Sequence, residues 1–284
     1  MNNQNLYSVN LNLIINNLIN IIIIILLVFL MYKSIVKSIE NFSDTKYEKN
    51  TDDPFNTALL LTTCINPKKD FLKKEKSEDP EKEREKDIKE RFDMYKKIIN
   101  KYLEKTNLKL HIIESSNSNL LGEFYKDNDR ISYHTFQLDK PVFFNNIENN
   151  STSSFEAYSI LKAYQAFRLD KYDKILKVTG RYYIPNVENI INSFEDRYDL
   201  YVQSQSHDDH RSQRSEIFGM KSNICPGIMI GTIRSKTLIE SYIYNLYKKW
   251  EENPYPPYVH QRIPLIHLDE PVFRGGDGEK ITEL

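Results

Sequence analysis

The sequence predicts an α/β domain built on an open, mostly parallel sheet flanked by helices, with a transmembrane helix in front of it. Two features predict the sheet: an apolar run is followed by a long amphipathic helix and a second apolar run, and this order returns further along the chain. Strands that alternate with helices are typical of parallel sheets. A third feature, an uncharged run near the N-terminus, predicts the transmembrane helix.

Length and charge limit the classes of function. The 284 residues suffice for one ordinary domain with accessory segments. The net charge of -1, from 39 basic and 40 acidic residues, gives no general attraction to nucleic acid, so we expect no nucleic-acid partner. Cys64 and Cys225 are the only cysteines, and they do not make a disulfide framework.

The N-terminal run covers residues 13–32, "LIINNLINIIIIILLVFLMY", and follows a short polar N-terminus at 1–12. Its length matches the roughly 20 residues that cross a bilayer core, which predicts a single-pass membrane anchor. A cleavable signal peptide would need a basic start and a small-residue cleavage site, and neither is present. The alternative is a buried core helix.

The orientation of this anchor depends on few charges. Lys33 and Lys37 follow it closely, and only the terminal amine precedes it. The positive-inside tendency therefore predicts that the following domain faces the cytoplasm. Glycosylation sequons at Asn41, Asn149 and Asn150 would matter only if the domain were lumenal. Residues 33–56 form a polar linker.

The folded domain is predicted at 57–284 and opens with "TALLLTTCINP", a buried strand that Pro67 ends. A charge run follows, which is typical of a solvated helix start or loop. From Ile88 a helix is predicted with one apolar stripe. The stripe consists of Ile88, Phe92, Tyr95, Ile99 and Tyr102.

The next strand lies within "LKLHIIESS", residues 108–116. In parallel sheets small molecules bind outside the carboxyl ends of the strands, so the polar residues that end these two strands are candidate ligands. They are Thr62, Thr63, Glu114, Ser115 and Ser116. Ordinary turn chemistry by Ser and Thr is the alternative.

A helix at "SFEAYSILKAYQAF", with Ser154 as its cap, precedes the strand "ILKVTGRYYIPN". Lys177, Thr179 and Arg181 would point to one face of that strand if it stayed extended past Gly180. Buried cations need either carboxylate partners or an anionic ligand, and the residues alone leave both open. Gly180 would let a backbone or ligand approach closely.

The remainder is predicted to be mostly scaffold. "GIMIGTI" is typical of a buried strand, and "TLIESYIYNLYKKW" of a helix with Leu238 on its apolar stripe. The loop "RGGDGEK" could present backbone N–H groups to phosphate. His267 and Asp269 could line the same site. Signatures of P-loop NTPases, α/β-hydrolases and zincins are absent from the sequence.

Five motifs resemble those of a family of glycosyltransferase-like proteins found in large DNA viruses and various microbes. They are "TTCINP" at 62–67, "RFDMY" at 91–95, "IESS" at 113–116, "KVTGRY" at 177–182 with Asn186, and "SEIFG" at 215–219. The family is similar to GT-A nucleotide-sugar transferases, and the likeness covers roughly 57–278. It implies a GT-A-like, Rossmann-like sheet. It also implies that the nucleotide sugar contacts Arg91, Thr179, Gly180, Tyr182 and Asn186.

This chain departs from the usual GT-A pattern at the end of the strand that contains Lys177. GT-A enzymes usually carry an Asp-x-Asp there that holds a divalent metal, whereas this chain has Thr179-Gly180-Arg181. We therefore expect a transferase that needs no metal cofactor, in which Arg181 contacts the diphosphate and Lys177 holds phosphate or a neighbouring carboxylate. Glu216 is the expected base that activates the acceptor hydroxyl.

Two alternatives remain open at this point. Asp208 and Asp209, flanked by His207 and His210, are interpreted as part of a polar loop, and the alternative is that they bind Mn²⁺ or Mg²⁺. The expected function is a membrane-anchored transfer of sugar from a nucleotide-sugar donor to a glycan, lipid or protein acceptor. The alternative is a non-catalytic, membrane-tethered protein with a degenerate transferase fold.

Overall fold

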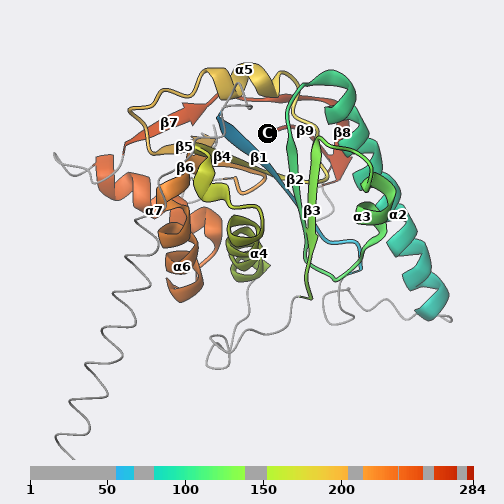
Figure 1. Ribbon diagram of the computed structural model, residues 1–284. Coiled ribbons are helices and arrows are strands. Elements are labelled where there is room, and N and C mark those ends of the chain that lie inside the picture. The colour runs from blue at the N-terminus through green and yellow to red at the C-terminus, as the bar shows by residue number, and fades with distance from the viewer. Residues whose placement is uncertain are drawn as a thin grey trace, which may run out of the picture. The chain divides into compact units, whose positions relative to one another are not determined.

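The computed structural model describes residues 56–66, 80–137, 152–203, 214–235, 237–251, 259–273 and 280–284. All of them belong to the compact unit Lys49–Leu284. Within it, a seven-stranded sheet lies between two sets of helices, and a two-stranded ribbon adjoins it (Figure 1).

The strand order is β3-β2-β1-β4-β6-β5-β7. β1 pairs in parallel with β2 and β4, β2 with β3, and β5 with β7, whereas β6 is antiparallel to both of its neighbours. Every strand except β6 therefore ends at one edge, the carboxyl edge. This confirms the predicted mostly parallel α/β sheet. The strands are β1 (Thr57–Thr63), β2 (Leu110–Glu114), β3 (Ile131–Thr135), β4 (Lys174–Thr179), β5 (Leu200–Gln203), β6 (Ile217–Lys221) and β7 (His260–Ile263).

One face of the sheet, the α2 face, packs against α2 (Pro80–Lys105), α3 (Leu120–Tyr125) and α5 (Val187–Asn192). The predicted stripe of α2 is confirmed, because Tyr95, Ile99 and Tyr102 are buried there against alternate residues of β1 and β2. The ribbon of β8 (His267–Phe273) and β9 (Lys280–Glu283) also packs on this side.

The other face, the α4 face, is covered by α4 (Thr152–Ala166), α6 (Cys225–Ser235) and α7 (Ile239–Glu251), which Figure 1 shows gathered on one side of the sheet. Short 3-10 turns at Leu169–Lys171 and Ser222–Ile224 lead into β4 and α6. The sheet thus separates two apolar cores, and β1, β2, β4, β5 and β6 contribute residues to both of them.

Several local predictions were wrong. Residues 227–233, predicted as a strand, lie in the helix α6, because the run presents Ile228, Met229 and Thr232 to the α4 core at helical spacing. Ser154 lies inside α4 rather than at its cap. Leu238, predicted on a buried stripe, precedes α7 and is 50% exposed.

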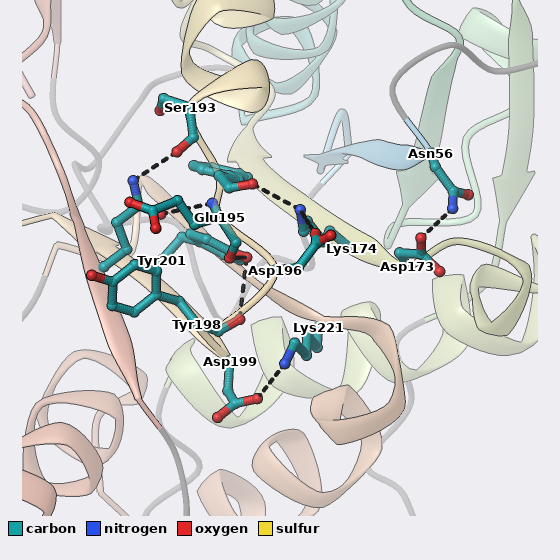
Figure 2. Close-up of polar contacts among 12 residues, drawn as sticks. Asn56, Asp173, Lys174, Ser193, Glu195, Asp196, Tyr198, Asp199, Tyr201 and Lys221 are labelled. Carbon is teal, nitrogen blue, oxygen red and sulfur yellow. Dashed lines mark hydrogen bonds and ion pairs between the residues drawn. The ribbon is translucent and has the colours of Figure 1, made fainter.

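The amino edge of the sheet carries a polar network (Figure 2). Lys174 donates to the carbonyl of Phe194 at 2.8 Å and pairs with Asp196 at 2.6 Å. Lys221 pairs with Asp199 at 2.9 Å, and the amide of Asn56 donates to Asp173. These charged side chains at the amino edge therefore have partners from the protein itself.

No helix in the described part of the chain is long and apolar enough to cross a membrane. The predicted anchor at 13–32 and almost all of the predicted linker at 33–56 lie outside the described residues. Both stay predictions.

Candidate functional site

The carboxyl edge gathers most of the polar residues singled out from the sequence. β1, β2 and β4 end there, and β6 begins there. Two successive backbone contacts join the strand ends: the N–H of Gly180 donates to the carbonyl of Thr62 at 2.9 Å, and the N–H of Thr179 donates to that of Glu216 at 2.8 Å. These contacts bring the ends of β1 and β4 and the start of β6 together.

Glu114 is the centre of a buried hydrogen-bond cluster between β1 and β2. Its carboxylate accepts from the hydroxyl of Thr63 at 2.7 Å, from the N–H of Ile65 at 3.1 Å, and from the N–H of Ser116 at 2.9 Å. The hydroxyl of Ser116 also donates to it, and that same hydroxyl oxygen accepts from the N–H of Asn66 at 2.8 Å. Glu114, Thr63 and Ser116 therefore shape the loop after β1 and are themselves buried.

Burial dominates the titration of this cluster. It raises the pKa of Glu114, and the hydrogen bonds from Ser116, Thr63 and Ile65 oppose that rise. Burial also raises the pKa of the Cys64 thiol, and the nearby charge of Glu114 adds to the effect. Cys64 is therefore held as a neutral thiol rather than as a reactive thiolate.

Helix α2 supplies two arginines and a tyrosine to the same loop. Arg91 donates to the carbonyl of Cys64 at 3.3 Å, and Arg84 donates twice to the side-chain oxygen of Asn66, at 3.1 and 2.8 Å. The hydroxyl of Tyr95 accepts from the N–H of Cys64 at 3.2 Å. The first half of α2 thus brings two positive charges to the carboxyl edge.

Sequence reasoning missed Arg84, because it lies in a charge run that is typical of a solvated surface. A signal was present. Arg84, Ile88, Arg91 and Tyr95 follow one another at steps of four, three and four residues, which places them on one face of a helix.

Gly180 is required by close packing at the end of β4. A Cβ at this position would lie 2.7 Å from the methyl group of Thr63, 3.0 Å from the carbonyl of Thr62 and 3.3 Å from the ring of Tyr95. Only a residue without a side chain fits there. The predicted close approach is therefore made by β1 and α2.

Arg181 lies in that turn, because the strand ends at Thr179 and the N–H of Tyr182 donates back to the carbonyl of Thr179 at 3.0 Å. The extended conformation does not persist past Gly180, so strand alternation does not set the direction of Arg181. Its positive charge lowers the pKa of Tyr95, which burial raises. The buried Nε of Arg181 has no hydrogen-bond partner in the described part of the chain.

Lys177 is 1% exposed and lies on the α4 face. Its ammonium group forms an ion pair with Glu156 of α4, donates to the hydroxyl of Thr179 at 2.9 Å, and donates to the carbonyl of Ser215 at 2.5 Å. An ammonium group has three donors, and three protein acceptors surround this one. Of the two partners predicted for Lys177, the structure supplies the neighbouring carboxylate.

Glu216 is 7% exposed and directly precedes β6. It stands opposite Thr179 in the antiparallel pairing, so its side chain shares the α4 face with Thr179 and Lys177. Ser215, just before it, donates to Glu240 of α7 at 2.6 Å. Lys177 and Ser215 together hold the segment that carries Glu216.

The structure does not present the side chains of Tyr182 and Asn186 at the carboxyl edge. Tyr182 is buried in the α2 core at 1% exposure, and its carbonyl accepts from Tyr102 at 3.2 Å. Asn186 begins α5 with a left-handed φ of 55°. Two residues further on, Glu188 accepts from the N–H of Asn107 at 2.7 Å. Asn107 precedes the start of β2, so this contact places the segment toward the amino edge.

His267 and Asp269, expected at the same site, lie in the ribbon. Asp269 pairs with Lys101 at 2.8 Å, and the neighbouring Glu270 pairs with Lys97 at 2.6 Å. Both lysines belong to the second half of α2, away from Arg84 and Arg91. The ribbon therefore fastens onto the α2 helix and adds neither residue to the strand ends.

The three residues at the end of β4 are not ligands that a divalent cation prefers. Thr179, Gly180 and Arg181 offer no carboxylate there, and Arg181 brings a positive charge. The described ranges hold no cluster of three or more His, Cys, Asp or Glu residues that could bind a metal ion. Asp208 and Asp209 lie outside those ranges.

No protein-family model matches the chain, and a search of curated proteins finds no match. The family resemblance drawn from the motifs therefore stays a prediction.

Solved structures share a distant likeness. A protein of Desulfovibrio desulfuricans assigned as a nucleotide-diphospho-sugar transferase aligns with a TM-score of 0.43 and 13% identity, over 74% of this chain and 80% of that one. A cytidylyltransferase of Leptospira borgpetersenii aligns with a TM-score of 0.40 and 10% identity, over 73% and 76%. The glycosyltransferase GlyE of Streptococcus pneumoniae aligns with a TM-score of 0.39 and 8% identity, over 72% of this chain and 45% of GlyE.

Proposed function

We propose that this protein is a glycosyltransferase that takes a sugar from a nucleotide-sugar donor, with Arg181 bound to the diphosphate. The observation that carries the proposal is the buried Nε of Arg181, which donates to no described group at the edge where three parallel strands end. A buried guanidinium donor normally has an acceptor. An anionic ligand would supply it.

A diphosphate suits this position for two reasons. The planar fork of arginine matches pairs of phosphate oxygens. A nucleoside diphosphate also gains negative charge as it leaves the sugar, and a preorganised cation stabilises that charge in the transition state. Since Thr179-Gly180-Arg181 carries no acidic metal motif, Arg181 takes that electrostatic role in the proposal, and no metal cofactor is required.

The ends of β1 and β2 suit the nucleoside part of the donor. Thr62, Arg91 and Ser115 are half-buried there, so their side chains are partly open to solvent. The cluster around Glu114 keeps the neighbouring loop in place. We propose that the base and ribose lie over these strand ends, with the diphosphate at Arg181.

Glu216 remains the proposed base for the acceptor hydroxyl. The ion pair of Lys177 with Glu156, and the bond from Lys177 to Ser215, support a fixed position for it. In this proposal Lys177 is a positioning residue, because its donors are engaged by the protein. The acceptor is a glycan, a lipid or a protein, and the anchor at 13–32 would hold the domain at the cytoplasmic surface of a membrane.

The alternative function is a non-catalytic membrane-tethered protein. The substitution of Thr179-Gly180-Arg181 for an acidic metal motif favours it.

The test is the release of nucleoside diphosphate from a panel of UDP-, GDP-, ADP- and CDP-sugars by the full-length protein. We expect one of these donors to be turned over in the presence of EDTA. Arg181→Met should lower kcat by about 100-fold, because one preorganised group that stabilises developing negative charge is removed. Arg181→Lys should recover only part of that loss, since an ammonium group lacks the guanidinium fork.

The matched control is Arg197→Met. Arg197 is exposed near the amino edge, where it pairs with Glu195 at 2.8 Å, so its loss should leave turnover unchanged. Full activity of Arg181→Lys with unchanged donor affinity would contradict the role given to Arg181. Turnover that EDTA abolishes would point to a metal-dependent enzyme, and no turnover of any donor would favour the non-catalytic alternative.

A further inference from the structure

Gln203, the last residue of β5, has a buried and unsatisfied side chain. It is 1% exposed, and neither its amide oxygen nor its amide nitrogen has a hydrogen-bond partner in the described part of the chain. Buried polar side chains are normally hydrogen-bonded, and an amide without partners is costly to bury. Nothing else in the described fold explains a polar side chain at this buried position. The missing hydrogen-bond partners of the Gln203 amide therefore need an explanation.

Gln203 lies at the same edge as the proposed diphosphate site. Lys177 of β4 pairs with Phe218 of β6, which pairs with Val202 of β5. Because neighbouring strands lie about 4.8 Å apart, Lys177 and Val202 are about 10 Å apart across the sheet. Gln203 is one residue nearer the carboxyl edge, and Arg181 follows the end of β4 at that edge.

Gln203 lies on the side of the sheet that α2 covers. Side chains alternate along a strand, and Tyr201 belongs to the α2 core whereas Val202 belongs to the α4 core. Gln203 therefore points to the α2 face. The charge of Arg181 acts on Tyr95, which comes from α2 on that face.

The described neighbours of Gln203 do not provide hydrogen-bonding side chains. Ile263 of β7 stands beside it in the parallel register, and Ile217 of β6 belongs to the same core. A primary amide has one acceptor oxygen and two N–H donors. A group that both donates and accepts, such as a pair of sugar hydroxyls, complements it.

We propose that the amide of Gln203 binds hydroxyl groups of the sugar that the donor carries, and so helps to select that sugar. This inference rests on the proposed function, with the diphosphate at Arg181. If the nucleoside lies over β1 and β2, the sugar lies on the opposite side of the diphosphate, toward β6 and β5. A diphosphate with its attached sugar spans the separation between β4 and β5.

The first test measures the stability of the free full-length protein. Gln203→Met has a similar volume and removes the unsatisfied amide, so we expect the melting temperature to rise by about 2 to 6 °C. The matched control is Gln261→Met, because Gln261 of β7 uses both ends of its amide: it accepts from Glu195 at 3.1 Å and donates to Ser193 at 2.8 Å. That variant should melt lower. A lower melting temperature for Gln203→Met would overturn the proposal, because the amide would then be satisfied in the free protein.

The second test compares binding of a nucleotide sugar with binding of the matching nucleoside diphosphate, using UDP-glucose and UDP first and then the GDP, ADP and CDP pairs. Gln203→Met should weaken binding of the nucleotide sugar by about tenfold, as expected for lost hydrogen bonds. Binding of the nucleoside diphosphate should change by less than about twofold. Gln261→Met should change neither.

The outcomes separate this inference from the proposed function. If Gln203→Met weakens neither ligand, or weakens both equally, Gln203 does not contact the sugar, while binding of the diphosphate still supports the donor site. If the unmutated protein binds none of these nucleotides, the proposed function fails and the role of Gln203 fails with it.

Discussion

Arg181 and Lys177 are four residues apart in the sequence, yet their surroundings differ. The ammonium group of Lys177 contacts three protein acceptors on the α4 face. The Nε of Arg181 has no acceptor in the described residues. The difference arises at Gly180, because the turn after it takes Arg181 out of the strand alternation. The sequence could predict that Lys177 and Arg181 need partners. It could not tell which of them is bound by protein groups and which is left for a ligand.

His111 shows a second effect at the scale of a single residue. It is 3% exposed, its Nε2 lies 3.0 Å from the hydroxyl of Tyr172, and it packs against Phe167. Burial lowers the pKa of His111 to about 3. The folded state therefore keeps this imidazole neutral over a pH range in which the unfolded chain becomes protonated.

The pH dependence of stability follows from that shift. A depressed pKa in the folded state means that the unfolded state binds more protons between about pH 6.5 and 3, so stability is present above this window and is lost as pH falls through it. We expect His111 to lower the free energy of unfolding by about 2 kcal/mol between pH 7 and pH 5. Urea unfolding at both values, with His111→Gln as the comparison, measures this. Parallel pH profiles for the two proteins would show that His111 makes no such contribution.

At the scale of secondary structure elements, Arg130 closes the end of α2. Arg130 directly precedes β3. Its guanidinium donates to the carbonyls of Leu103 at 2.8 Å, Thr106 at 2.5 Å and Leu108 at 3.0 Å. The last carbonyls of a helix lack partners within the helix, and a cation near them is favourable. One side chain thus joins the end of α2 to the start of β2 and β3.

Loss of this contact should destabilise the domain. We expect Arg130→Met to reduce the free energy of unfolding by about 2 kcal/mol, because hydrogen bonds from a charged donor to backbone carbonyls are removed. Arg197→Met, at an exposed ion pair, should cost less than about 1 kcal/mol. Urea midpoints of the two variants provide the comparison. Equal midpoints would mean that Arg130 does not stabilise the end of α2.

Elements with a clear period were predictable from the sequence, whereas the apolar run 227–233 was not. The stripe of α2 from Ile88 to Tyr102 repeats over several turns, and helix α2 contains it as predicted. The run 227–233 is apolar at nearly every position, so periodicity could not separate strand from helix there. Packing decided it, since the helix buries Ile228, Met229 and Thr232 together.

At the scale of the whole domain, the alternation of strands and helices predicted a parallel sheet and its ligand edge. It could not predict the order of the strands, because β4 pairs with β1 and β6 lies between β4 and β5 through contacts between residues distant in sequence. The convergence of Thr62, Glu114, Thr179 and Glu216 follows from that order. Gln203 reaches the same edge for the same reason, and nothing in its local sequence indicated a site.

The central claim is that Arg181 holds the diphosphate of a nucleotide donor without a metal ion, and calorimetric titration tests it most directly. UDP, GDP, ADP and CDP would be titrated in EDTA into the full-length protein, Arg181→Met and the control Arg197→Met. We predict that one of these nucleotides binds, that Arg181→Met weakens it by about 10- to 100-fold, and that Arg197→Met leaves it unchanged. Equal binding by Arg181→Met, or no binding of any nucleotide to the unmutated protein, would contradict the account.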